Sequence, residues 1–396
     1  MSVIADIFRN AGGAYRERFG DRMLPSHLRA MRDIELCRTP ALGGHLYLCD
    51  DCQKTELAYH SCRNRHCPTC QGDRAELWAK AQKQRILPTD YYLITFTLPE
   101  SLRPLARSHQ KEIYNALLRC AAQSIQKLAK DPKYIGAQPG MIGVLHTWTR
   151  KLDYHPHAHF LVTAGGLTAD GLAWRRARNP TFLMPGRVLS PIFRAKLRDT
   201  LKATGLYDFV PKKAWKQKWV VHVTRTGDGE QMTEYLGRYL FRPPISNRSI
   251  VRYHAGRVTF RYRDSASKHQ KRCTVTPEEF IRRFLQHVLP RGFTRVRHYG
   301  CFSPGSAKKL ALARRLLEGL RGTATTPENS PDPIDLNSIE HRIDLADPHE
   351  EEKAAKSSER LCPFCKKATM RKIAEIPRAP RRRWAQLGQL PQRAPP

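Results

Sequence analysis

The sequence predicts an α+β fold built on an antiparallel sheet, preceded by a small zinc-binding module and followed by a flexible linker and a basic tail. Three observations predict it. β-Branched and aromatic runs such as YYLITFTL at residues 91–98 are typical of strands, and they lie among stretches with helical periodicity. Six of the eleven cysteines are concentrated between Cys37 and Cys70, which is typical of a module held by metal. Residues 323–359 are acidic, proline-bearing and poor in large apolar side chains, which predicts a linker.

Helices and strands are expected in a definite order along the chain. Apolar residues at helical spacing predict helices within residues 1–36, 72–87, 109–129, 232–240 and 277–289. Apolar runs predict strands at 91–98, 141–149, 155–163 and 218–226, and a hairpin at 251–263. We therefore expect four segments: N-terminal helices with the zinc module over 1–75, a main domain over 76–320, the linker over 321–360, and the tail with a Cys-x-x-Cys pair over 361–396.

The charge of the chain predicts a nucleic-acid partner. Lysine and arginine total 69 against 36 acidic residues, which gives a formal net charge of +33. A merely soluble basic protein is disfavoured, because such an excess repels itself unless a polyanion offsets it. No run of 18 apolar residues and no signal peptide is found. We expect a cytoplasmic protein without a membrane partner, associated with the nucleoid when bound to DNA, whose cysteines are metal ligands and buried side chains and not disulfides.

A histidine-rich strand is the first candidate site. In HPHAHFLVT, the strand period of two places His155, His157 and His159 on one face, and apolar residues on the other. Histidines two residues apart on a strand can share one divalent ion, such as Mg²⁺ or Mn²⁺, so His157 and His159 are the candidate ligands. Hydrogen-bonding alone is the competing interpretation. The third ligand stays open between His146, placed opposite if the hairpin turns near Leu152, and three alternatives, namely His155, Gln231 and Glu234.

Two tyrosines form the second candidate site. Tyr235 and Tyr239 are four residues apart in EQMTEYLGRYLFRPP, so both phenols lie on one face of the expected helix. Packing is the ordinary explanation of such a pair. A phenol has a pKa near 10 and needs a metal or a positive field to act as a nucleophile, and Arg238 and Arg242 flank the pair.

Cysteine spacing predicts a zinc site. Cys49-x-x-Cys52 and Cys67-x-x-Cys70 are separated by 14 residues, close to the spacing of paired zinc knuckles, so these four are the expected ligands of one Zn²⁺. A second site could use Cys37, His45, Cys62 and His66, but these lack a Cys-x-x-Cys pair and are disfavoured. Cys362 and Cys365 form a half-site without identified partners. The remaining cysteines are interpreted as structural: Cys120, Cys273 and Cys301.

These motifs together resemble the two-tyrosine, HUH-type rolling-circle transposases of the insertion sequence ninety-one family. The resemblance rests on RTPALGGHLYLCDDC, SCRNRHCPTCQ, HTWTRKLDYHPHAHFLVTAGGL, YLGRYLFRPPISN and FLQHVLPRGFTRVRHYG, and it covers about residues 20 to 305. It implies an N-terminal zinc-binding domain and a nuclease domain of the HUH endonuclease fold. It also implies that His157 and His159 hold the catalytic metal and that Tyr235 and Tyr239 are paired nucleophiles, which nick and rejoin single-stranded DNA at transposon ends and targets through a 5′-phosphotyrosine.

Two rival functions are distinguishable from this one. A plasmid replication initiator or relaxase uses the same chemistry but nicks a single origin, whereas a transposase recognises both ends of the element that encodes it. A non-catalytic zinc DNA-binding regulator explains the charge and the cysteines, but it needs neither a divalent-metal site nor paired phenols.

Overall fold

The computed structural model describes residues 3–70, 85–179, 181–227, 244–264, 267, 269–322, 360–367 and 369–380. The chain divides into two compact units. Unit 1 takes Met1–Gly72, Ile245–Leu285 and Asn337–Pro396, and unit 2 takes Asp73–Pro244 and Gln286–Leu336. This division differs from the four expected segments, because residues 245–285 and the whole expected tail belong to the unit that contains the N-terminus.

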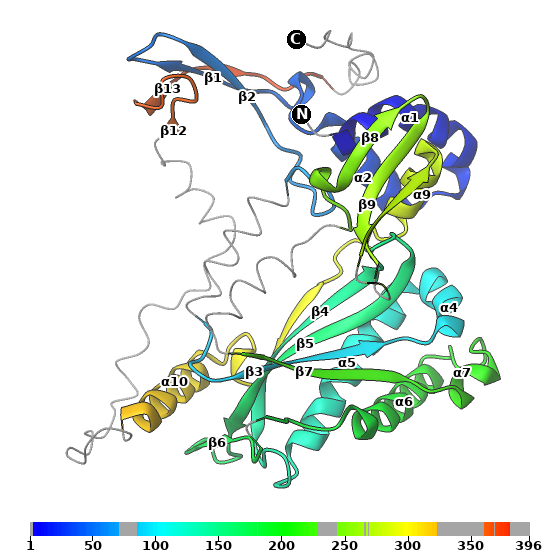
Figure 1. Ribbon diagram of the computed structural model, residues 1–396, viewed down its shortest axis with the longest axis vertical. Helices are drawn as coiled ribbons and strands as arrows, with labels where there is room; N and C mark the ends of the chain where they lie inside the picture. The colour runs from blue at the N-terminus through cyan, green and yellow to red at the C-terminus, as the bar shows by residue number, and fades with distance from the viewer. Residues whose placement is uncertain are drawn as a thin grey trace. The chain divides into compact units, whose positions relative to one another are not determined.

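Unit 2 is built on an antiparallel sheet whose strands differ in length. Its main strand order is β11-β4-β5-β3-β7, and β6 pairs with the end of β5. Figure 1 shows α5 and α6 lying along one side of this sheet. The strands are β3 (Tyr91–Thr97), β4 (Gln138–Trp148), β5 (Tyr154–Leu167), β6 (Trp174–Arg176), β7 (Val220–Gly227) and β11 (Val296–Tyr299). The helices are α4 (Arg103–Ser108), α5 (Gln110–Ala129), α6 (Gly186–Ala203), α7 (Lys212–Lys216) and α10 (Ala307–Gly322), with 3-10 turns η3 (Glu100–Leu102) and η5 (Gly300–Phe302).

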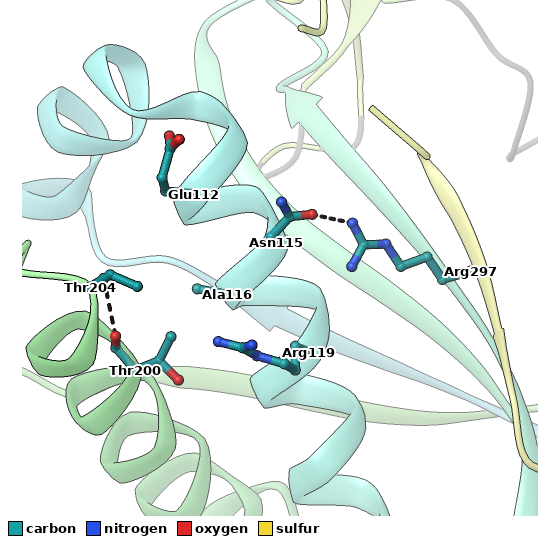
Figure 2. Close-up of a pocket in the computed structure, with 7 residues that line it drawn as sticks. All are labelled: Glu112, Asn115, Ala116, Arg119, Thr200, Thr204 and Arg297. Carbon is teal, nitrogen blue, oxygen red and sulfur yellow. Dashed lines mark hydrogen bonds between the residues drawn. The ribbon is translucent and has the colours of Figure 1, made fainter. Parts of the chain in front are cut away.

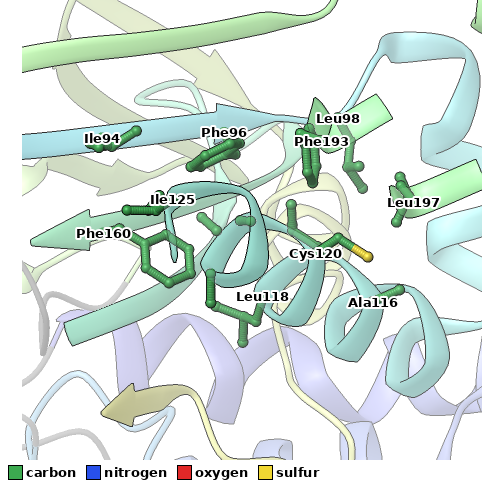
Figure 3. Close-up of a cluster of buried hydrophobic side chains, with 14 of the residues drawn as sticks. Ile94, Phe96, Leu98, Ala116, Leu118, Cys120, Ile125, Phe160, Phe193 and Leu197 are labelled. Atoms are coloured by element: carbon green, nitrogen blue, oxygen red, sulfur yellow. The ribbon is translucent and has the colours of Figure 1, made fainter. Parts of the chain in front are cut away.

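The core of unit 2 lies between one face of the sheet and helices α5 and α6. Phe96 of β3 packs edge-on against Phe160 of β5, with ring centroids 5.9 Å apart, and against Phe193 of α6 at 5.0 Å. Figure 3 shows these rings together with Leu118 and Ile125 of α5. Alternate residues of β5, Ala158, Phe160 and Val162, belong to this core. The strand period of two therefore directs the histidines of β5 to the opposite face, as expected.

Unit 1 combines a helical core with two small antiparallel sheets. Phe8 of α1 packs against Phe284 of α9, with ring centroids 5.2 Å apart, and Phe260 of β9 packs against Phe280 of α9 at 6.1 Å. One sheet has the order β12-β13-β1-β2 and the other β10-β9-β8. The elements are α1 (Val3–Phe19), η1 (Gly20–Arg22), α2 (Pro25–Leu36), η2 (Pro40–Leu42), β1 (Gly44–Cys49), β2 (Thr55–Tyr59), η4 (Asn247–Ser249), β8 (Ile250–His254), β9 (Arg257–Arg263), β10 (Gln270–Val275), α9 (Pro277–Leu285), β12 (Arg360–Leu361) and β13 (Thr369–Ile376).

The α+β class with antiparallel sheets is confirmed. The expected strands at 91–98, 141–149, 155–163 and 218–226 correspond to β3, β4, β5 and β7. The expected hairpin is β8–β9, whose turn residues Ala255 and Gly256 both have positive φ, as a tight two-residue turn requires. The helix expected at 232–240, most of that at 72–87 and the linker at 323–359 lie outside the described residues.

The expected tail contains a strand that completes a sheet. β13 pairs with β1 along its length, from Gly44 opposite Ile376 to Cys49 opposite Met370. Composition did not reveal this strand, because most of its residues are exposed and basic residues such as Arg371 and Lys372 interrupt any apolar alternation. Tertiary pairing with β1 supplies the backbone hydrogen bonds that define it.

Candidate functional site

Three histidines from adjacent strands form a cluster on the second face of the unit 2 sheet. His146 of β4 lies directly opposite His157 of β5, and His159 follows two residues later on the same face. One ring nitrogen from each of the three lies within 4.8 Å of the others. The ring centroids of His146 and His159 are 4.8 Å apart, and those of His157 and His159 are 4.7 Å apart. Three imidazoles in this arrangement match the donor set of a divalent-metal site.

Hydrogen bonds orient two of these rings. Nδ1 of His157 donates to the backbone carbonyl of His155 at 2.6 Å, which leaves the lone pair of His157 on Nε2. Nδ1 of His159 lies 2.9 Å from Oγ1 of Thr95, its neighbour across the β3–β5 ladder. In the tautomer that donates this hydrogen bond, Nε2 of His159 also keeps its lone pair. Orientation of one ring nitrogen by a neighbouring acceptor is the usual support of a metal-ligating histidine.

Burial keeps the imidazoles of His157 and His159 neutral. Burial lowers the pKa of His157 to about 4, and the charge of His155 acts in the same direction, although the hydrogen bond to the His155 carbonyl opposes it. The pKa of His159 is also lowered, first by burial and then by the charges of His157 and Arg295. Neutral imidazole is the form that binds a metal, so the residues present fit a divalent ion at neutral pH.

Among the candidates for the third ligand, His146 is the one that lies in the histidine cluster. Nδ1 of His155 accepts a hydrogen bond from Nη2 of Arg103 at 2.9 Å, and His155 is not part of the cluster. The hairpin turns near Leu152 as expected, and a register shift between His146 and Trp148 leaves His146 opposite His157. Gln231 and Glu234 lie outside the described residues.

The turn beside the histidines is held by two residues that the sequence did not single out. Leu152 is buried and has a φ of 65°, a conformation that a leucine adopts at a cost on the order of 1 kcal/mol. Its carbonyl accepts hydrogen bonds from Nε2 of Gln286 at 2.5 Å and from Nε2 of His287 at 3.2 Å. Nδ1 of His287 lies 3.3 Å from Oγ1 of Thr147, and burial lowers the pKa of His287 to about 3. The available signal was the polar pair that directly follows the amphipathic helix α9, among the apolar residues Leu285 and Val288.

The cysteines form two clusters of four. Cys37, Cys62, Cys67 and Cys70 have their sulfur atoms within 4.8 Å of one another, and so do Cys49, Cys52, Cys362 and Cys365. The expected site with Cys49, Cys52, Cys67 and Cys70 is therefore wrong in its grouping: each Cys-x-x-Cys pair belongs to a different cluster. The pairs are separated because Cys49 ends β1 beside β13, whereas Cys67 and Cys70 lie in the loop after β2.

The residues set aside for a second zinc site are also divided. Cys37 and Cys62 join Cys67 and Cys70 in one cluster, while His45 lies beside His60 and Glu375. Glu375 is exposed and forms an ion pair with Lys372, with Nζ and Oε2 3.2 Å apart. His66 belongs to none of the metal-compatible groups found among the described residues.

Comparisons with known proteins match both units. Residues 7–98 match the family model described as "Transposase zinc-binding domain", of the insertion sequence ninety-one type, and residues 140–310 match the model described as "Putative transposase". A Sinorhizobium fredii protein named "Putative transposase y4qJ" is 39% identical over 335 residues, which cover 79% of this chain and 84% of that protein. The chain belongs to the insertion sequence ninety-one family of transposases.

A second relative supports the same assignment. The "Transposase for insertion sequence element IS801" of Pseudomonas savastanoi pv. phaseolicola is 29% identical to this transposase over 294 residues, which cover 68% of the chain and 70% of the relative. No solved structure matches the transposase. The first cysteine cluster lies within the zinc-binding domain at residues 7–98, and the histidine cluster lies within residues 140–310. The transposase therefore acts on DNA and carries a zinc-binding N-terminal domain.

A pocket of unit 2 lies apart from the histidine cluster. It is lined by residues of α5, α6 and β11, and Figure 2 shows Arg297 bonded to Asn115 across it. Helices α5 and α6 pack on the sheet face opposite to the histidines. The guanidinium of Arg297 also lies 5.4 Å from the ring centroid of Phe293, so packing explains its position. In the part of the transposase that the structure describes, no helix has the length and apolar character needed to cross a membrane.

Proposed function

We propose that this transposase nicks and rejoins single-stranded DNA at the ends of its insertion sequence, with Tyr235 and Tyr239 as nucleophiles and His146, His157 and His159 as ligands of Mg²⁺ or Mn²⁺. The observation that carries the proposal is the cluster of three imidazoles on adjacent strands, two of which, His157 and His159, are oriented through Nδ1 and kept neutral by burial. A divalent ion there would stabilise the negative charge that develops on a phosphate under attack. A DNA-binding regulator has no use for such a site.

Positive side chains next to the histidine row fit a DNA phosphate. The guanidinium of Arg103 is bonded to His155, and that of Arg295 lies 5.0 Å from the ring centroid of Trp148, which itself stacks on His146. These arginines can bind and orient a phosphodiester at the histidine cluster. They also provide the positive field that lowers the cost of forming a phenolate.

The tyrosines lie outside the described residues, but chain length supports their reach to this face. β7 ends at Gly227, and Tyr235 comes eight residues later. Residues 228–231, if extended, span about 13–14 Å, and the four positions to Tyr235 in the expected helix add about 6 Å. Gly227 lies across from Tyr91, which pairs with Thr163, four residues from His159 along β5. From Gly227 to His159, the path therefore runs roughly 13 Å along the strands and roughly 10 Å across two strand spacings. Both tyrosines are within reach of the histidine cluster.

The proposed reaction exchanges one phosphodiester for another. The Tyr hydroxyl oxygen bonds to phosphorus, the bond from phosphorus to the 3′-oxygen breaks, and the phenol proton ends on that 3′-oxygen. The products are a 5′-phosphotyrosine and a free 3′-hydroxyl, which can later reverse the reaction. Two phenols about one helical turn apart allow a second strand to be captured before the first is released.

Oligonucleotide cleavage with tyrosine variants tests the proposal. Tyr→Phe removes the hydroxyl and keeps the ring, so each single variant should still form a covalent adduct with a single-stranded oligonucleotide spanning an element end, while the double variant forms none. Nicking confined to a plasmid origin instead of both element ends would favour the replication initiator. An adduct in the double variant, or mass spectrometry that places the DNA on Tyr253 or Tyr262, would contradict the proposal.

We also propose that Cys37, Cys62, Cys67 and Cys70 hold the zinc of the N-terminal domain. Sγ of Cys70 lies 3.4 Å from Sγ of Cys37 and 3.6 Å from Sγ of Cys62. Four mutually close thiols match a structural zinc site. Two residues with positive φ, Arg38 and Arg63, each directly follow a cysteine of this cluster.

A further inference from the structure

The second cysteine cluster joins the two ends of the chain. Sγ of Cys49 lies 3.7 Å from Sγ of Cys365, and Sγ of Cys52 lies 3.7 Å from Sγ of Cys362. The latter two residues are 310 positions apart in the sequence. Of the four cysteines, only Cys49 and Cys52 fall within the matched zinc-binding domain, which spans residues 7–98.

Both halves of this cluster have the same backbone geometry. After Cys49, the amide of Gln53 donates to the Cys49 carbonyl at 2.9 Å, and after Cys362 the amide of Lys366 donates to the Cys362 carbonyl at 3.0 Å. Gln53 and Lys366 have positive φ angles of 53° and 57°. Two equivalent turns that present two thiols each are the arrangement that a tetrahedral four-thiolate zinc site requires.

The pairing of strands holds the two turns together. β13 lies between β12 and β1, so Cys362, just after β12, comes beside Cys49 at the end of β1. Cys49 and Cys362 are almost completely buried, and among the described residues the hydrophobic cluster around them contains one further buried side chain, Met370. So small an apolar core contributes little to the free energy of folding, and in small modules a bound metal usually supplies the missing stability.

Disulfides explain the cluster less well than metal does. All four cysteines are free, and sulfur atoms 3.7 Å apart are far beyond the roughly 2.05 Å of a disulfide bond. We propose that Cys49, Cys52, Cys362 and Cys365 bind a second zinc ion, which fastens the C-terminal segment to the N-terminal domain. The transposase then carries two structural zinc ions per chain.

Zinc content of the full-length protein tests this site. Wild type should contain two zinc ions per chain by elemental analysis, and Cys362→Ser with Cys365→Ser should contain one. The matched control, Cys120→Ser with Cys273→Ser, removes two cysteines outside both clusters and should keep two. One zinc in wild type, or a zinc content in the Cys362/Cys365 variant of either two or none, would overturn the proposal.

A conservative variant separates metal binding from a folding defect. Imidazole also binds zinc, so Cys365→His should restore the second ion, whereas Cys365→Ser should not. In limited trypsin digestion, wild type and Cys365→His should release the C-terminal segment more slowly than Cys365→Ser. Equal zinc content and equal release in the His and Ser variants would contradict a ligand role for Cys365.

A second and independent observation concerns the β10-β9-β8 sheet of unit 1. Val258 and Phe260 of β9 are buried, so the alternate residues face outward. Arg261 and Arg272 lie directly opposite each other on this outer face, an arrangement that like charges disfavour. The three strands contain no acidic residue. Six exposed basic side chains occupy the outer positions: Arg252, His254, Arg257, Arg261, Arg263 and Arg272.

We infer that this basic sheet face binds the DNA phosphate backbone independently of sequence. Thr259 and Thr274, hydrogen-bonded to each other at 2.9 Å, lie among the basic positions, and no phenylalanine, tyrosine or tryptophan of the three strands is at an outer position of the paired register. Contacts to phosphate thus fit the face better than base stacking does.

Salt dependence of DNA binding tests the basic sheet face. Replacing Arg252, Arg261 and Arg272 by glutamine should reduce the slope of log affinity against log salt by up to about 2.7 for a duplex oligonucleotide, at roughly 0.9 per phosphate contact. The control removes three exposed charges of unit 2, Arg187, Lys212 and Lys213, and should change the slope less. An unchanged slope, or an equal fall in the control, would overturn the inference.

Discussion

The histidine cluster and the cysteine clusters use different kinds of sequence information. His146, His157 and His159 come from one hairpin, β4–β5, whose turn is held within unit 2. The cysteine clusters gather residues from several segments of unit 1, in one case from both ends of the chain. Local periodicity can therefore predict a site on one hairpin. A site assembled from distant segments can be predicted only when the pairing of the strands is known. We expect the two kinds of cluster to differ in role as well, with catalysis at the histidines and stability from the cysteines.

Loss of the first cysteine cluster should have the largest effect, and it should fall on folding. Cys67→Ser with Cys70→Ser removes a site whose zinc affinity, on the order of 10 kcal/mol or more in small modules, is coupled to folding. Residues 37–70 should then lose protection from hydrogen exchange, measured by mass spectrometry, while residues 146–159 keep theirs. Unchanged protection of residues 37–70 would contradict a stabilising role for the first cysteine cluster.

The second largest effect is expected at the histidines, and it should fall on activity. His157→Ala with His159→Ala should slow nicking at least about 10³-fold, because a catalytic metal supplies several kcal/mol and each 1.36 kcal/mol is tenfold in rate. The zinc content should stay at that of wild type. His109→Ala, outside the cluster, serves as the control. Undiminished nicking by the double variant, or by wild type in EDTA, would remove the metal from the mechanism.

A smaller effect should distinguish the third ligand from its neighbour. His146→Ala should weaken Mn²⁺ binding by at least about 10-fold to 100-fold, whereas His155→Ala should change it much less, because Nδ1 of His155 is bonded to Arg103. Titration calorimetry of the two variants measures the difference. Equal losses for His146 and His155 would show that the cluster geometry does not define the ligands.

The smallest effect is expected for a residue that only orients a ligand. Thr95→Val keeps the size of the side chain and removes the hydroxyl that contacts Nδ1 of His159, so Mn²⁺ affinity should fall by about 10-fold. Thr97→Val, at the position opposite His157 on the same strand, is the matched control. If both variants bind Mn²⁺ like wild type, orientation by Thr95 is unimportant.

Sequence by itself determined the parts of this transposase that depend on local pattern. The strand period of two placed His157 and His159 on the face away from Phe160, and the structure has them there. A predicted turn near Leu152 made His146 a candidate neighbour of His157, but their pairing depends on a register shift between His146 and Trp148 that only the structure shows. Helical and strand runs likewise gave the α+β class and most of the described elements of unit 2.

Tertiary structure alone decided which distant residues meet. Cysteine spacing predicted a single site for Cys49, Cys52, Cys67 and Cys70, but the pairing of β13 with β1 brings the C-terminal cysteines to Cys49 instead. The support of the Leu152 carbonyl by Gln286 and His287 is another contact between distant positions. Side-chain periodicity is a property of a few neighbouring residues, whereas a thiol contact across 310 positions, such as that of Cys52 with Cys362, depends on how the whole chain packs.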